Sequence, residues 1–158
     1  MTIAFDTLVR NYPSNKTITR EALFKEIGWD DLISNPSYEN TCAIRVSLGL
    51  IKSGVKVAGR IAIKKGPHKG QWIEPGQAKL AKLLATRSYL GAPQTMKGAD
   101  AERTIGPRRG VVAFWRIPGY LNGAGGHTDL VSPTQGGFRA CGSDCYWNSA
   151  EVWFWELH

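Results

Sequence analysis

Apolar residues recur at helical spacing in the first half of the chain. Ile44, Leu48 and Ile51 lie three or four positions apart, which predicts one buried helical face. Another helix is bounded by Thr19, a good N-cap residue, and by Gly28, which suits a left-handed C-terminal residue. The helices expected from such patterns cover residues 20–27, about 40 or 41 to 52, and about 77–86, whereas residues 55–76 are expected to be irregular.

The second half of the chain has the pattern of β-strands. Residues 110–117 (GVVAFWRI) form a short apolar run with β-branched and aromatic side chains, typical of a buried strand. Further strands are expected at residues 127–131, 138–140 and 152–157, with turns at 118–126 and 133–137. Helices followed by strands predict an α+β fold with a mostly antiparallel sheet.

Length and charge narrow the class of protein. The chain has 158 residues, which suits a single domain over residues 1–158, and its 42% hydrophobic residues argue against disorder. The net charge is +7, but the basic residues are scattered and lack the aromatic interleaving of RNA-binding surfaces. We expect no nucleic-acid partner. No apolar run is long enough for membrane insertion, and residues 1–10 do not resemble a cleaved export signal.

The three cysteines fall into two groups. Cys141 and Cys145 are separated by three residues, whereas Cys42 is far away in sequence. A zinc site needs about four ligands, so a disulfide across this short loop is the simpler interpretation, with two reduced thiols as the alternative. We expect no metal and no cofactor. A disulfide would place the protein in an oxidising compartment.

Cys42 and His127 are candidates for nucleophilic catalysis. Cys42 is expected in the first turn of its helix, where unpaired backbone N–H groups and the helix dipole favour a thiolate. His127 follows Gly125 and Gly126, whose missing side chains would leave the imidazole open to a substrate. A thiolate paired with an imidazole is the arrangement that acyl transfer requires. The alternatives are a buried structural cysteine and a polar strand residue without a catalytic role.

Two carboxylates compete to orient the imidazole. Asp129 lies two residues after His127, so both side chains point to the same face of a strand. Asp144 lies inside the Cys141–Cys145 loop, where an acid in a closed loop is harder to explain without a role. We therefore favour Asp144 and keep Asp129 as the alternative. The backbone N–H of Cys42 and a neighbouring group are the expected oxyanion donors.

Three motifs resemble those of type VI secretion amidase effectors. Residues 38–47 (YENTCAIRVS) are similar to the nucleophile motif, residues 126–130 (GHTDL) to the histidine motif, and residues 141–145 (CGSDC) to a Ser-Asp element between two cysteines. The third and fourth families of these effectors are the most similar. The resemblance extends over about residues 38–157. Asp144 directly precedes Cys145, whereas related sequences have one more residue between them, which leaves Asp144 and Asp129 open.

This resemblance implies an NlpC/P60-like, papain-type cysteine hydrolase acting on amide bonds of peptidoglycan stem peptides. It implies either cleavage of the D-alanine cross-link or cleavage between D-glutamate and diaminopimelate. It also implies delivery by the type VI apparatus, without a cleaved signal, into the periplasm of a target Gram-negative cell, and a periplasmic immunity protein as a partner. Because stem peptides carry carboxylates, Arg45 is a candidate binding residue, and Tyr120 a candidate cleft residue. The alternative is a non-catalytic, basic protein that binds the cell envelope.

Overall fold

An antiparallel sheet is the centre of the fold. This computed structural model describes residues 1–134 and 139–158. In that part of the chain the larger sheet has five strands in the order β3-β7-β4-β5-β6, and every neighbouring pair is antiparallel. Its strands are β3 (Gln94–Lys97), β4 (Gly110–Trp115), β5 (His127–Pro133), β6 (Arg139–Cys141) and β7 (Glu151–Glu156). The expected α+β class with an antiparallel sheet is confirmed.

The helices that the sequence predicted are present. They are α2 (Arg20–Ile27), α3 (Cys42–Lys52) and α4 (Gln77–Leu84). The Thr19 hydroxyl accepts a hydrogen bond from the backbone N–H of Ala22, and Gly28 ends α2 with φ of 78°. Capping therefore sets both ends of α2 as expected. None of the described helices has the length and apolarity to cross a bilayer.

Several elements were not predicted. They are α1 (Phe5–Asn11), α5 (Gly98–Ile105), the short paired strands β1 (Ile61–Ala62) and β2 (Trp72–Ile73), the edge strand β3, and the 3-10 turns η1 (Asp30–Leu32), η2 (Pro36–Tyr38) and η3 (Leu121–Gly123). These segments are short or carry weak apolar periodicity, and tertiary packing stabilises them. The expected strand at residues 138–140 corresponds to β6, while residues 135–138, including most of the expected turn, lie outside the described part.

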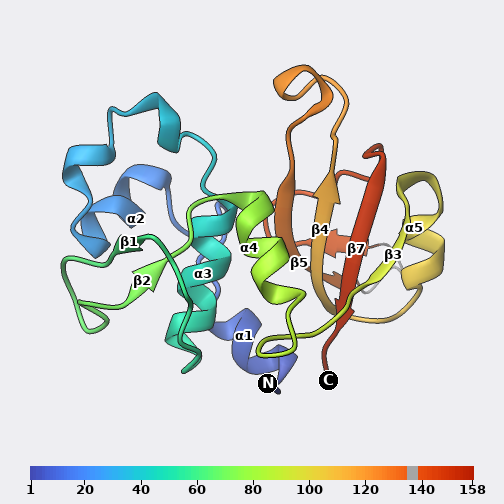
Figure 1. The fold of residues 1–158 in the computed structure, drawn as a ribbon, viewed down its shortest axis with the longest axis horizontal. Coiled ribbons are helices and arrows are strands. Elements are labelled where there is room, and N and C mark those ends of the chain that lie inside the picture. The colour runs from blue at the N-terminus through green and yellow to red at the C-terminus, as the bar shows by residue number, and fades with distance from the viewer. Residues whose placement is uncertain (135–138) are drawn as a thin grey trace.

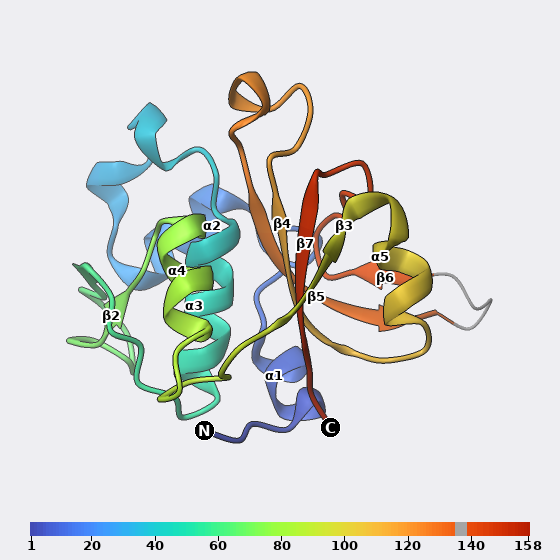
Figure 2. The same cartoon turned by 45° about the vertical axis from the view of Figure 1, so that its right-hand side comes forward.

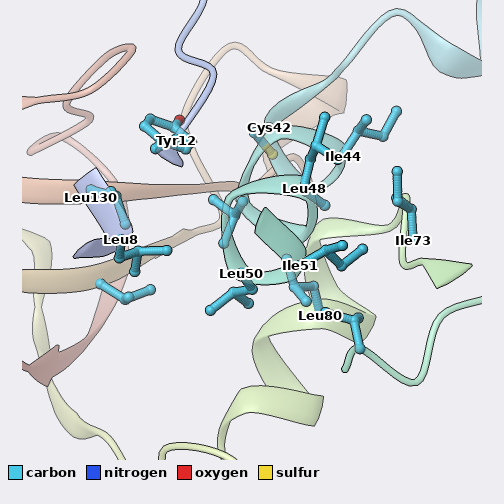
Figure 3. Packing of buried hydrophobic residues seen from close by; sticks show 14 of the residues in the cluster. Leu8, Tyr12, Cys42, Ile44, Leu48, Leu50, Ile51, Ile73, Leu80 and Leu130 are labelled. Carbon is cyan, nitrogen blue, oxygen red and sulfur yellow. The ribbon is translucent and has the colours of Figure 1, made fainter. Parts of the chain in front are cut away.

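Helices cover both faces of the sheet (Figures 1 and 2). Val111 and Ala113 of β4 belong to the cluster that includes the buried residues of α3 and α4, whereas Val112 and Phe114 belong to the cluster that includes α5. This alternation follows from the two-residue period of a strand. Helix α3 is packed among the other buried residues of the first cluster. Figure 3 shows Leu48 within this packing. Burial of α3 fixes the position of its first residue.

Candidate active site

The first residue of α3 is the free cysteine, Cys42. Its side chain is buried, with 5% of the residue exposed. Its backbone N–H donates a 3.0 Å hydrogen bond to Oδ1 of Asn40, which stands in front of the helix. The sulfur thus lies at the positive end of the helix dipole, a place that favours a thiolate. The N–H that we expected to serve as an oxyanion donor is engaged with Asn40 in this structure.

His127 is the first residue of β5 and faces the cysteine. Its imidazole interacts with the Cys42 side chain, and its Nε2 lies 2.7 Å from Oδ2 of Asp129. Phe114 stacks on the ring, and Tyr146 meets it edge to face with ring centroids 5.0 Å apart. With Nε2 bound to Asp129, Nδ1 is the nitrogen left for the thiol. The thiol and the imidazole therefore meet, as the sequence predicted.

The charge state of His127 reflects these partners. Burial lowers its pKa, but hydrogen bonds with Asp129 and Cys42, together with the negative charges of both groups, outweigh burial and raise the pKa to about 9. The protonated imidazole, beside the Cys42 sulfur, is therefore the form favoured near neutral pH. That pair provides both a nucleophile and a proton donor.

Asp129 rather than Asp144 contacts the imidazole. Asp129 is fully buried, whereas Asp144 is exposed at the cleft, and its backbone N–H donates to Oδ2 of Asp129 at 3.0 Å. Our preferred expectation for the orienting acid therefore does not match the geometry, and the alternative does. The physical reason is the strand period, which places residues 127 and 129 on the same side of β5.

The expected disulfide between Cys141 and Cys145 is present. The loop that it closes directs two backbone N–H groups at the Asp129 carboxylate. The N–H of Ser143 donates to Oδ2 at 2.9 Å, and the N–H of Asp144 donates to the same oxygen at 3.0 Å. Oδ1 receives the backbone N–H of Leu130 at 2.8 Å. The carboxylate thus accepts three backbone N–H groups in a buried position. Within residues 1–134 and 139–158, no three His, Cys, Asp or Glu side chains form a group suited to a metal ion.

A cleft of about 550 Å³ opens beside Cys42 and His127. Tyr120, from the loop between β4 and β5, lines it as expected. Arg45 also reaches its wall, but only 3% of this residue is exposed. Its Nη1 donates to the carbonyls of Pro13 and Ile18, and its Nε donates to Thr41. These bonds tie α3 to the preceding chain, so Arg45 has a structural role that the sequence did not indicate.

Gly125 and Gly126 serve packing rather than access. A Cβ at Gly125 would collide with the ring of Tyr120, and a Cβ at Gly126 would collide with Gln77. The missing side chains that we expected to leave room for a substrate instead let neighbouring side chains approach the backbone. Gly126 still lines the cleft, and its carbonyl accepts a 3.4 Å hydrogen bond from Nδ2 of Asn40.

Sequence reasoning missed Tyr12, whose hydroxyl donates a 3.0 Å hydrogen bond to Oδ1 of Asp129. It also missed Ser143, the residue before Asp144, whose backbone N–H donates to the Asp129 carboxylate. Tyr12 lies in the first 37 residues, where no motif was recognised, and is 117 positions from Asp129 in sequence. No local pattern signals such a contact.

The chain is similar to solved effector structures over its whole length. It aligns with the crystal structure of the type VI effector Tae4 from Enterobacter cloacae at 20% identity and a TM-score of 0.79, covering 100% of this chain and 98% of that one. The Tae4–Tai4 effector–immunity complex from the same organism gives 20% identity, a TM-score of 0.78 and 100% coverage of both chains. Tae4 from Salmonella typhimurium, in complex with Tai4 from Enterobacter cloacae, gives 15% identity and a TM-score of 0.70. This match covers 98% of this chain and 99% of that one.

These structures confirm the expected papain-type, NlpC/P60-like fold. No curated protein sequence matches the chain. The model of the family "Type VI secretion system (T6SS), amidase effector protein 4" (Tae4) matches residues 38–155. Members of this family are effectors that hydrolyse amide bonds of peptidoglycan. Since the match covers most of the sequence, including all three motifs, the chain belongs to the type VI secretion amidase effector 4 family.

Proposed function

We propose that Cys42, His127 and Asp129 form the catalytic triad with which this effector hydrolyses amide bonds in peptidoglycan stem peptides. The observation that carries the proposal is that one imidazole is shared between a thiol and a carboxylate. Nε2 of His127 lies 2.7 Å from Asp129, and the same ring interacts with the Cys42 side chain in the cleft that both residues line. This is the nucleophile, base and orienting acid of a cysteine hydrolase.

The reaction has two halves. The Cys42 thiol passes its proton to His127, and its sulfur attacks the amide carbon, so that a carbon–sulfur bond forms as the carbonyl electrons move to oxygen. The carbon–nitrogen bond then breaks, and the leaving amine takes the proton from His127. In the second half a water molecule gives a proton to His127 and attacks the thioester, which releases the acid and restores the thiol–imidazole pair. Asp129 keeps the imidazole oriented and stabilises its charged form throughout.

The oxyanion formed in each half needs hydrogen-bond donors. The backbone N–H of Cys42 is the donor closest in sequence to the attacking sulfur, and it is bonded to Oδ1 of Asn40 before substrate binds. An acyl oxygen that takes this place must displace the Asn40 oxygen. The Nδ2 group of Asn40, 3.4 Å from the Gly126 carbonyl, is a second donor at the rim of the cleft.

The site of action and the partners follow from the family. We propose delivery by the type VI apparatus, without a cleaved signal, into the periplasm of a target Gram-negative cell, where a disulfide such as Cys141–Cys145 persists. Two solved relatives are complexes of Tae4 with Tai4 immunity proteins. A periplasmic immunity protein is therefore the expected partner of this chain.

Digestion of purified Gram-negative sacculi tests the proposal. Wild-type protein should release peptide fragments that mass spectrometry identifies, whereas Cys42→Ala should release none while retaining its circular dichroism spectrum. Free-thiol blocking of the wild type with iodoacetamide should have the same effect. Fragment release by folded Cys42→Ala, or sacculus binding by the wild type without any release, would contradict the proposal.

Defined muropeptides then identify the bond. A cross-linked dimer and an uncross-linked tetrapeptide, each incubated with the wild type, separate the two cleavages that remain open. Conversion of dimer to monomers indicates cleavage at the D-alanine cross-link. Release of a diaminopimelate-containing fragment from the monomer indicates cleavage after D-glutamate.

A further inference from the structure

The acid of the proposed triad is held on its far side by a residue from the start of the chain. Tyr12 caps the C-terminal end of α1, and its hydroxyl donates a 3.0 Å hydrogen bond to Oδ1 of Asp129. The other oxygen of the carboxylate, Oδ2, is the one that faces His127. Tyr12 is 7% exposed, so water competes little for this bond.

Tyr12 is itself fixed against the disulfide loop. A Cβ at Gly142 would collide with the Tyr12 ring and come within 2.9 Å of Oδ1 of Asp129, so the absence of a side chain there lets the ring approach. The hydroxyl also lies 3.4 Å from Oγ of Ser143. That oxygen accepts the backbone N–H of Asn15 at 3.2 Å. Figure 3 shows the Tyr12 ring beside α3, at the end of the helix that carries Cys42.

A second contact joins the same segment to the loop. Nζ of Lys16 donates to the carbonyl of Cys141 at 3.3 Å. The chain from Tyr12 to Lys16 thus touches the loop and the Asp129 carboxylate at several points. Burial, and after it the charge of Asp129, raise the pKa of Tyr12 well above its ordinary value. The hydroxyl therefore keeps its proton, and remains a donor, across the range in which the enzyme works.

We propose that Tyr12 is a positioning residue that locks the Asp129 carboxylate in the rotamer that presents Oδ2 to His127. This inference rests on the proposed function. A carboxylate turns about its Cβ–Cγ bond at little cost unless both oxygens are held. Oδ1 is held by two donors, the backbone N–H of Leu130 from within β5 and the Tyr12 hydroxyl from outside the sheet. Residues before position 38, which lie outside the family match, thereby complete the catalytic site.

Tyr12→Phe removes the hydroxyl and keeps the ring. We expect kcat on soluble muropeptides, released from sacculi by a muramidase, to fall about tenfold with KM unchanged, because one hydrogen bond to a charged group is lost. We also expect the pKa of His127, followed by NMR titration, to fall below about 9, since a carboxylate that is held less firmly presents Oδ2 to the charged ring less well.

Tyr89→Phe is the matched control. The Tyr89 hydroxyl accepts from the N–H of Ala58 and donates to the carbonyl of Lys56, so its loss also removes hydrogen bonds, but on another part of the molecule. This variant should lower the melting temperature and leave both kcat and the pKa of His127 unchanged. A purely structural role for Tyr12 predicts the same result for Tyr12→Phe.

The outcomes separate the two claims. If folded Tyr12→Phe keeps either the wild-type kcat or the wild-type His127 pKa, the positioning role is wrong. If the wild type does not hydrolyse muropeptides, or if Cys42→Ala does, the proposed function is wrong, and the inference about a catalytic site fails with it. The titration still reports in that case whether Tyr12 acts on His127 through Asp129.

Discussion

Strand β5 and the Cys141–Cys145 loop contribute to the candidate site in different ways. The strand supplies side chains, since His127 and Asp129 both project from it. The loop supplies backbone groups, since the N–H groups of Ser143 and Asp144 both donate to Asp129. A strand places side chains two residues apart on one face, whereas a short closed loop can converge consecutive N–H groups on one anion.

That difference explains why the acid inside the loop is not the one on the imidazole. The loop has the geometry of an anion receptor, and the Asp144 side chain points to solvent when its N–H points inward. The disulfide therefore stabilises the charge of Asp129 rather than presenting a charge of its own. We infer that changes in β5 remove the chemistry, while changes in the loop weaken it.

The largest effect is expected from the strand. His127→Ala removes the proton donor and acceptor, and kcat should fall about 10⁵-fold, near the level left by loss of the nucleophile. His158→Ala is the control, because that histidine is exposed and lies 3.4 Å from Glu156, away from the cleft. Muropeptide turnover measures both. If kcat falls less than tenfold in folded His127→Ala, His127 is not the proton donor and acceptor of the reaction.

An intermediate effect is expected from the loop. Cys141→Ser combined with Cys145→Ser opens the ring and lets the donors of Ser143 and Asp144 move away from Asp129. We expect kcat to fall about tenfold, as for the loss of one hydrogen bond to a charged group. Cys42 is the single thiol in this variant and is buried in the fold. Its rate of alkylation, compared with that of the wild type, therefore reports whether the variant is folded. Full activity in the double variant would show that the closed loop is dispensable.

The pH dependence sharpens the account of β5. Because the pKa of His127 is about 9 in the folded chain and ordinarily 6.5, the fold binds this proton more tightly than the unfolded chain does. The stabilisation is complete below pH 6.5 and is lost as pH rises through about 9. Hydrolysis should lose its proton donor over the same range, so kcat/KM should fall above about pH 9.

Urea unfolding of the wild type and of His127→Ala at a series of pH values measures the stability part. The difference between their free energies of unfolding should shrink between pH 6.5 and pH values above 9. A difference that stays constant across that interval, or an alkaline limb of kcat/KM near pH 6.5, would contradict the raised pKa of His127.

Local signals in the sequence accounted for much of the structure. Thr19 and Gly28 marked both ends of α2, and the apolar spacing of Ile44, Leu48 and Ile51 marked α3 with Cys42 at its start. The pairing of Cys42 with His127 followed from chemistry, because each needs the other. The sequence also limits the candidate acids to two, Asp129 and Asp144.

What could not be predicted depends on long-range packing. The choice of Asp129 over Asp144 requires knowing which way the loop turns its N–H groups. Tyr12 reaches the site only because α1 packs against α3, and nothing near Tyr12 in sequence signals an active site. Helix α5 begins with Gly98. A larger residue does not fit there, because its Cβ would collide with the Ser149 carbonyl. Local propensity disfavours glycine in a helix, so its packing against the sheet decides the element.

Comparison of Asp129→Asn with Asp144→Asn tests the central claim most directly. Both changes are isosteric and remove one negative charge, but only the first changes the carboxylate that contacts the His127 imidazole. With muropeptide turnover as the measurement, we expect Asp129→Asn to lower kcat about 10⁴-fold and Asp144→Asn to leave it within about twofold, since an exposed charge is screened. The reverse order, with Asp144→Asn inactive and Asp129→Asn near wild type, would contradict the account.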